Sequence, residues 1–328
     1  MKRITRAALS ILLCLSTLFS LISCVLPVDF GGSSAGGISH SVTFVAGETE
    51  KTVSVVHGSV VSPPRIPQTE NRLFAGWYED EDFLQEYLFS DPVYEDITLY
   101  GRFVLDGAAL TNAITQKIMP ALVTVQNVYP VTKTQQITSQ GSGFIYKIEG
   151  GKAYALTNCH VAYTPVSTQS ITVEDFRGET HEAQIYRKNP FAAPAIAAEY
   201  DLAILVFSYE GSELCTIPFA EEDIGNSEEV ISLGSPENQS HAITFGEVLG
   251  YRKANLSDIS PEESNVTFDI VYHTAAITNG SSGGPLLNGD LSLVGINYAG
   301  IPPEDGDGFG HGCAVPLAKV IEFLSLHE

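Results

Sequence analysis

Basic residues are scarce in this chain. Seventeen lysines and arginines stand against 39 aspartates and glutamates, which gives a net charge of −22. Such a negative surface repels phosphate backbones, so we do not expect nucleic acid as a partner. It also repels an anionic membrane surface, so attachment to a membrane would have to come from acyl chains.

Cysteine is also scarce, with five in 328 residues. Cys14 and Cys24 belong to the N-terminal segment discussed next, which leaves three, namely Cys159, Cys215 and Cys313. Three cysteines allow at most one disulfide, and the sequence does not identify its partners. The eight histidines lack metal-ligand spacing such as His-Glu-x-x-His, so we predict no metal and no cofactor.

Long apolar runs are missing after the first 23 residues. There, Lys2, Arg3 and Arg6 precede a mostly apolar stretch from residue 7 to 22. This pattern is typical of a secretory signal peptide and is short for a membrane span. Leu-Ile-Ser-Cys at 21–24 resembles the bacterial lipobox, which implies cleavage before Cys24 and lipidation of its sulfur. The alternative is an ordinary secreted protein.

These features predict a lipoprotein signal peptide over residues 1–23. A linker rich in glycine and serine follows over 24–40, and this composition favours flexibility. We therefore expect a protein of the bacterial cell envelope that lies outside the cytoplasm and is anchored to the membrane by lipid.

What the chain does contain is a serine among glycines, in the run Gly-Ser-Ser-Gly-Gly-Pro at 280–285. A serine hydroxyl is a poor nucleophile until a base takes its proton and donors hold the resulting oxyanion. Glycines allow a tight turn in which the N–H groups of Gly280 and Ser282 converge. We predict Ser282 as the nucleophile and Gly280, Ser281 and Ser282 as the oxyanion hole.

Two further segments provide the partners that such a serine needs. Thr-Asn-Cys-His-Val at 157–161 ends a strand-like run with His160, and Asp201 begins another before Leu-Ala-Ile-Leu-Val. The order His160, Asp201, Ser282 is that of the chymotrypsin arrangement. Each residue alone is usually structural, but three in this order predict a catalytic triad.

These motifs, together with Gly-Ser-Gly-Phe-Ile at 141–145, carry a family resemblance. From about residue 106 onward the chain resembles trypsin-like serine proteases of the HtrA/DegP type, without a PDZ domain. The resemblance implies a chymotrypsin-like double six-stranded β-barrel over 105–328. This sequence departs from the family pattern at two positions. Ser281 stands where Asn or Asp is commoner, and Cys159 stands before the histidine where the HtrA type usually has Asn or another small residue.

The patterning supports this mainly β class. Many short strands separated by clusters of glycine, proline, asparagine and serine favour a sandwich or barrel. A helix is expected over 106–119. Another is expected at the end, with four residues on one face: Leu317, Val320, Ile321 and Leu324.

Residues 41–104 form a separate small module. Phe-Ala-Gly-Trp-Tyr at 74–78 and Asp-Ile-Thr-Leu-Tyr-Gly at 96–101 resemble the internalin-type B repeat. The resemblance implies a β-grasp-like domain that serves as a spacer or as an adhesive module for a surface ligand. An inert stalk remains an equal alternative, and Trp77 is expected in its core.

The resulting hypothesis is a membrane-anchored serine endopeptidase outside the cytoplasm. His160 takes the proton of Ser282, Asp201 orients His160, and peptide bonds of protein or peptide substrates are cleaved through an acyl-enzyme. The alternative is a catalytically silent surface-binding lipoprotein that uses the protease fold and the B repeat as an adhesion scaffold.

The resemblance also suggests the primary substrate pocket. Its base is expected at Ala276, and its walls at Ile296, Asn297, Tyr298, Gly312, Cys313 and Ala314. A pocket without a carboxylate disfavours cleavage after Lys or Arg and favours short aliphatic side chains. His311, beside one wall, leaves open a preference for acidic side chains.

Overall fold

The computed structural model describes residues 37–66, 69–130, 132, 134–163, 169–186, 199–235, 241–253, 266–301 and 311–326. Cys24, the predicted signal peptide and most of the predicted linker therefore lie outside the described residues. No helix within these ranges is long and apolar enough to cross a membrane.

The N-terminal domain is a four-stranded sheet with the order β2-β1-β4-β3. Its strands are β1 (Ser39–Ala46), β2 (Thr49–Val56), β3 (Arg72–Tyr78) and β4 (Ile97–Leu105). β1 and β2 form a hairpin, whereas β1 and β4 run parallel. Alternate residues face one side, where Phe44, Leu99 and Trp77 are buried, so Trp77 belongs to the core as predicted.

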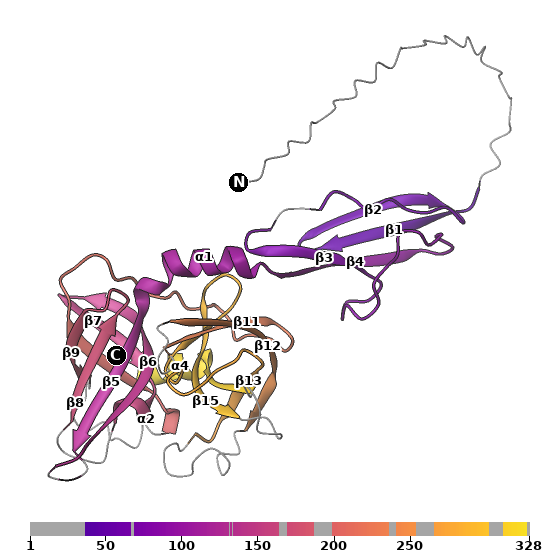
Figure 1. Cartoon of the computed structure of the whole chain (residues 1–328). Coiled ribbons are helices and arrows are strands. Elements are labelled where there is room, and N and C mark those ends of the chain that lie inside the picture. Colours follow the sequence, from indigo (N-terminus) through magenta and orange to yellow (C-terminus); the bar gives the residue numbers. More distant parts are fainter. Residues whose placement is uncertain are drawn as a thin grey trace, which may run out of the picture.

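One helix connects this domain to the barrels (Figure 1). α1 (Gly107–Lys117) begins at Asp106, whose carboxylate accepts the N–H groups of Ala108 (3.1 Å) and Ala109 (3.0 Å). These bonds satisfy donors that a helix start otherwise leaves unpaired. A short 3₁₀ turn, η1 (Met119–Ala121), contains Pro120 and leads into the first barrel. The helix predicted over 106–119 is confirmed.

The first barrel closes in the order β10-β7-β6-β5-β8-β9. Its apolar interior includes Val125, Ile145, Ala155 and Leu205. The strands are β5 (Leu122–Pro130), β6 (Gln136–Glu149), β7 (Lys152–Thr157), β8 (Ser170–Asp175), β9 (Thr180–Ile185) and β10 (Ala203–Ser208).

The second barrel closes in the order β11-β12-β13-β16-β15-β14. Its strands are β11 (Glu229–Gly234), β12 (Ala242–Lys253), β13 (Asp269–His273), β14 (Pro285–Leu287), β15 (Leu293–Ile301) and β16 (His311–Pro316). Two closed six-stranded barrels behind a small β domain confirm the predicted fold class.

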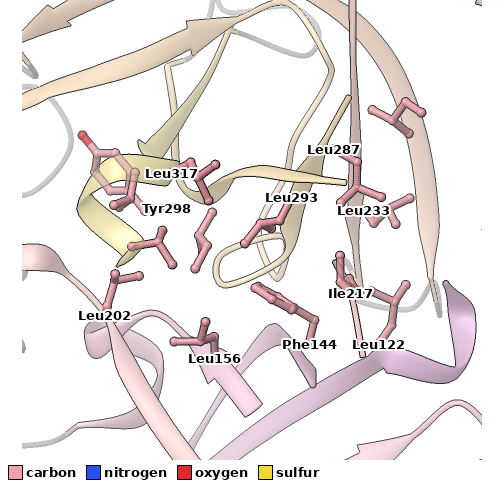
Figure 2. Packing of buried hydrophobic residues seen from close by; sticks show 14 of the residues in the cluster. Leu122, Phe144, Leu156, Leu202, Ile217, Leu233, Leu287, Leu293, Tyr298 and Leu317 are labelled. Atoms are coloured by element: carbon pink, nitrogen blue, oxygen red, sulfur yellow. The ribbon is translucent and has the colours of Figure 1, made fainter. Parts of the chain in front are cut away.

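A large apolar cluster lies between the barrels (Figure 2). Phe144, Leu156 and Leu202 from the first barrel belong to this cluster together with Leu233 and Leu293 from the second. All five are fully buried. Because the predicted catalytic residues come from both barrels, this cluster fixes their relative position.

The last helix, α4 (Leu317–Ser325), packs on this cluster, but one predicted contact is wrong. Ile321 is 48% exposed, whereas Phe323 is 1% exposed and takes its place. At about 100° per residue, Phe323 lies on the Val320 side of the stripe and Ile321 on its outer edge. The buried face is rotated toward Val320.

The N-terminal domain also contacts the second barrel directly. The Glu229 carboxylate on β11 accepts the N–H of Leu105 at 3.0 and 3.2 Å, and Arg72 Nη1 lies 3.6 Å from it. Gly289 leaves room for the side chains of both Leu105 and Arg72. The junction is therefore a defined contact in addition to the covalent link.

Candidate active site

Strand pairing brings His160 and Asp201 together in the first barrel. β7 and β10 are antiparallel, with Thr157 opposite Ala203, so the end of one strand meets the start of the other. His160 lies on a single helical turn, α2 (Cys159–Ala162), that follows β7. Its Nδ1 is 2.8 Å from Asp201 Oδ2, and its backbone N–H donates to Asp201 Oδ1 at 3.1 Å.

Asp201 is fully buried, whereas the His160 side chain is 21% exposed. The aspartate has a left-handed backbone with φ of 50°, which costs free energy for any residue with a side chain. Two bonds hold it there: its carbonyl accepts Asn158 Nδ2 (2.9 Å) and the Cys159 N–H (3.1 Å). The Asp201 carboxylate is thus aimed at Nδ1 of His160.

Ser282 lies on a tight turn in the second barrel, between β13 and β14. The Ser281 N–H donates to the Thr278 carbonyl (2.9 Å), and Ser281 Oγ accepts the Thr278 N–H in return (3.2 Å). Gly280 and Gly283 both have positive φ, at 91° and 87°. The Ser282 hydroxyl donates to the carbonyl of Tyr298 at 3.3 Å.

Glycine at 283 is required by space as well as by conformation. A Cβ there would overlap the carbonyl oxygen of Ser142 and the hydroxyl of Thr157, both from the first barrel. This position therefore admits no side chain. The turn that carries the predicted nucleophile Ser282, hereafter the nucleophile turn, packs directly against the other barrel.

The turn leaves two backbone donors free. Among the described residues, the N–H groups of Gly280 and Ser282 make no hydrogen bond. Both belong to the predicted oxyanion hole. Unpaired N–H donors beside a serine hydroxyl can stabilise the negative charge that develops on an oxyanion.

A polar network inside the second barrel supports the segment after Ser282. The Asn297 backbone exchanges hydrogen bonds with Gly283 (2.8 Å) and Gly284 (2.9 Å). Its side-chain Nδ2 donates to Ser232 Oγ at 2.9 Å, and its Oδ1 lies 3.1 Å from His273 Nε2. Because Oδ1 only accepts, His273 carries its proton on Nε2.

Sequence reasoning assigned no role to His273. Burial lowers its pKa to about 4, despite the opposing hydrogen bond to Asn297, so the ring is neutral at pH 7. Its ring packs where a side chain at Gly312 would otherwise lie. The nearest signal in the sequence is its position two residues before the Ala-Ala-Ile stretch at 275–277, which leads to Ser282.

The predicted pocket residues come from three neighbouring segments. Ala276 precedes the nucleophile turn, and β15 and β16, which carry the other six, are paired with each other. Cys313 is fully buried, and burial raises its pKa to about 12. His311 packs its ring against Tyr272, with centroids 5.0 Å apart.

Cys159, Cys215 and Cys313 form no disulfide with one another. Within the described ranges, one group of side chains has donor atoms close enough to hold a metal, at Asp175, Glu179 and His181. Arg177 already pairs with this group, at 2.8 Å from Asp175 and 2.7 Å from Glu179. The cluster is a satisfied ion-pair network on the β8–β9 hairpin and contains none of the predicted triad residues.

Comparison with known families agrees with this geometry. Residues 141–296 match the trypsin-like peptidase domain, and residues 40–102 match the Listeria-Bacteroides repeat domain.

Two curated relatives are 28% identical to this chain. The serine protease Do-like HtrA of Bacillus subtilis aligns over 232 residues, which are 66% of this chain and 48% of the relative. The serine protease HTRA1 of Xenopus tropicalis aligns over 214 residues, 65% and 42%. The chain thus spans about half the length of the curated relatives it matches.

Among solved structures, the Rv3671c protease of M. tuberculosis in its active form has the same fold. The TM-score is 0.52 at 20% identity, over 68% of this chain and 87% of that one. The chain therefore carries a trypsin-like peptidase domain with HtrA/Do-like serine protease homologues, preceded by a Listeria-Bacteroides repeat domain.

Proposed function

We propose that this protein is a serine endopeptidase. The observation that carries the proposal is the hydrogen-bonded pair of His160 and Asp201 (2.8 Å), combined with a nucleophile turn whose Gly280 and Ser282 N–H groups are unpaired. A base with a fixed tautomer and a vacant pair of donors are the two requirements of serine catalysis.

In the proposed reaction, the Ser282 hydroxyl turns from the Tyr298 carbonyl toward His160 Nε2. Oγ attacks the substrate carbonyl carbon as its proton passes to Nε2, and the carbonyl oxygen becomes the oxyanion. The C–N bond then breaks, His160 gives its proton to the leaving amine, and an acyl-enzyme remains. Water repeats the sequence and releases the acid.

Asp201 has two tasks in this scheme. It holds the proton of neutral His160 on Nδ1, so that Nε2 carries the lone pair that takes the Ser282 proton, and it stabilises the imidazolium that forms. Full burial supports both tasks, because water does not weaken the ion pair. Activity is expected to fall on acidification, since a protonated imidazole cannot act as a base.

The proposal is tested by labelling with a fluorophosphonate probe and by peptide hydrolysis. Ser282→Ala and His160→Ala should each remove nearly all turnover, and Ser282→Ala should no longer be labelled. Ser281→Ala is the matched control, because alanine keeps the backbone N–H at this position and loses only the hydroxyl bond to Thr278. One such hydrogen bond is worth about 1 kcal/mol, so activity should stay within about tenfold. A wild-type protein that is neither labelled nor active would favour the silent, surface-binding alternative.

For specificity, we propose a small apolar primary pocket at Ala276, Ile296–Tyr298 and Gly312–Ala314. Ala276 offers no carboxylate to a basic side chain, and His273 fills the space beside Gly312. Short aliphatic side chains should be preferred by a graded margin, because a methylene is worth about 1–3 kcal/mol. Profiling with a peptide library checks this, and dominant cleavage after Lys or Arg would refute it.

We also propose that the chain is a lipoprotein outside the cytoplasm, anchored through Cys24 and acting on protein or peptide substrates. We further propose that residues 41–104 form the repeat and residues 105–328 form the protease domain. Cys24→Ala should release the protein from the membrane fraction or block its processing. Equal partition of variant and wild type would contradict the anchor.

A further inference from the structure

Ser142 lies on β6 of the first barrel, yet its polar contacts reach the second. It is 2% exposed. Its N–H donates to the carbonyl of Ser282 (2.7 Å), and its hydroxyl donates to the carbonyl of Gly280 (2.6 Å). The hydroxyl oxygen accepts the N–H of Ser235 (2.7 Å).

These contacts fall on the two residues whose N–H groups form the predicted oxyanion hole. The carbonyls of Gly280 and Ser282 both bond to Ser142, while their N–H groups stay unpaired. Gly280 has φ of 91°, and a glycine visits many other conformations when nothing restrains it. The Ser142 hydroxyl is the side-chain restraint on its carbonyl.

The hydroxyl has little freedom to do anything else. Its single proton is donated to the Gly280 carbonyl, and its oxygen accepts the N–H of Ser235, a residue that follows β11 of the second barrel. Gly234 leaves no side chain in the way: a Cβ there would lie 3.2 Å from Ser142 Oγ and 3.0 Å from Ser281 Cα. Ser142, the β11 end and the nucleophile turn are packed in contact.

Removal of the hydroxyl would leave two buried backbone groups unpaired, the Gly280 carbonyl and the Ser235 N–H. An unpaired buried carbonyl costs free energy, so Gly280 would adopt other φ and ψ values in which its carbonyl finds a new partner. A change in its φ would turn its N–H away from the position that an oxyanion needs. The effect would fall on the transition state, because the ground-state carbonyl depends less on these donors.

We propose that Ser142 is a positioning residue for the oxyanion hole, and that it fixes the nucleophile turn of one barrel from a strand of the other. The proposal rests on the endopeptidase function proposed above.

The experiment compares wild type with Ser142→Ala and Ser142→Cys. Steady-state hydrolysis of a peptide ester gives kcat and KM, and a peptidyl boronic acid serves as the transition-state analogue. Ser142→Ala should lower kcat about 10- to 100-fold, below the typical loss of about 100- to 1,000-fold when a hole donor itself is removed. KM should change less than about threefold, and the boronic acid should lose affinity by the same factor as kcat/KM.

Tyr209→Phe is the matched control. The Tyr209 hydroxyl is also buried in the first barrel and accepts two backbone N–H groups, of Glu213 and Leu214, at 2.8 Å each. Its loss should lower the melting temperature without changing kcat. If Ser142→Ala does not fold, Ser142→Cys, which keeps a weak donor, should still show an intermediate loss of kcat.

An active wild type with unchanged kcat and unchanged boronic acid affinity in the folded variant would overturn this proposal alone. A fall in melting temperature without a fall in kcat would do the same. A wild type that neither hydrolyses the ester nor binds the boronic acid would overturn the endopeptidase function, and this proposal with it.

Discussion

The two barrels have the same number of strands but hold their parts of the site differently. The first barrel has an apolar interior and presents two side chains, His160 and Asp201, that bond to each other. The second encloses a buried polar network around Asn297 and presents Ser282 on a backbone turn. Activity should therefore depend on the chemistry of two side chains in the first barrel, and on the absence of a side chain at Gly283 in the second.

The largest effect is expected in the first barrel. Asp201→Asn should lower kcat about 10,000-fold with little change in fold, because an amide cannot hold the same His160 tautomer. Hydrolysis rates and a circular dichroism spectrum check this. Activity within tenfold of wild type would mean that the 2.8 Å bond does not serve catalysis.

In the second barrel, adding a side chain to the backbone at Gly283 should remove both stability and activity. Gly283→Ala combines an unfavourable φ of 87° with overlap on Ser142 and Thr157, so we expect a loss of about 3 kcal/mol or more and no detectable hydrolysis. Thermal melting and hydrolysis rates measure both.

Gly150→Ala is the control for that change. It has φ of 59° but nothing within 4 Å of its Cβ position. Only backbone strain of about 1 kcal/mol is expected, with full activity. Similar losses in the two variants would contradict the role of packing between the barrels.

The two barrels should also differ in how their stability depends on pH. The pKa of His273 is about 4 when folded and about 6.5 when unfolded. Below pH 6.5 the unfolded chain binds a proton that the folded one does not, so stability is lost as pH falls from about 6.5 to 4, by roughly 3 kcal/mol.

In the first barrel, burial would raise the pKa of Asp175, but hydrogen bonds from Arg177 and His181 outweigh it and lower the pKa to about 2. Its contribution is present above the unfolded value and is lost only as pH falls from about 3.8 toward 2. Hydrogen exchange between pH 7 and 4 should therefore show earlier loss of protection in the second barrel. His273→Gln should reduce this slope; an unchanged slope would argue against His273 as its source.

The smallest effect is expected at the junction. Glu229→Gln should weaken the contact to Leu105 and Arg72, and this partly exposed ion pair is worth little. Small-angle scattering should show a broader range of orientations of the N-terminal domain. Hydrolysis should not change, and an altered kcat would mean that the junction affects the site.

Local motifs carry the prediction of the fold class, which the two closed barrels confirm, and of the triad, which stays a prediction. The serine among glycines, the strand-terminal histidine and the aspartate before an apolar strand each carry their chemistry within a few residues. The interactions of Ser142 and His273 were not predictable in this way. Both depend on contacts between residues far apart in the sequence, which arise only once the strands are paired. Phe323 was missed for a simpler reason, because the helix pattern alone leaves the rotation of the buried face open.

The reciprocal bonds between Asn158, Cys159 and Asp201 have a consequence for assembly. The aspartate binds the backbone of the histidine, and the residues before the histidine bind the carbonyl of the aspartate. Neither half is complete without the other, and both lie within the first barrel. The proton on His160 Nδ1 should therefore give an NMR signal that appears when the first barrel closes, even while the second is still unfolded. His160 would then have the tautomer expected of a base before the turn that carries Ser282 has formed.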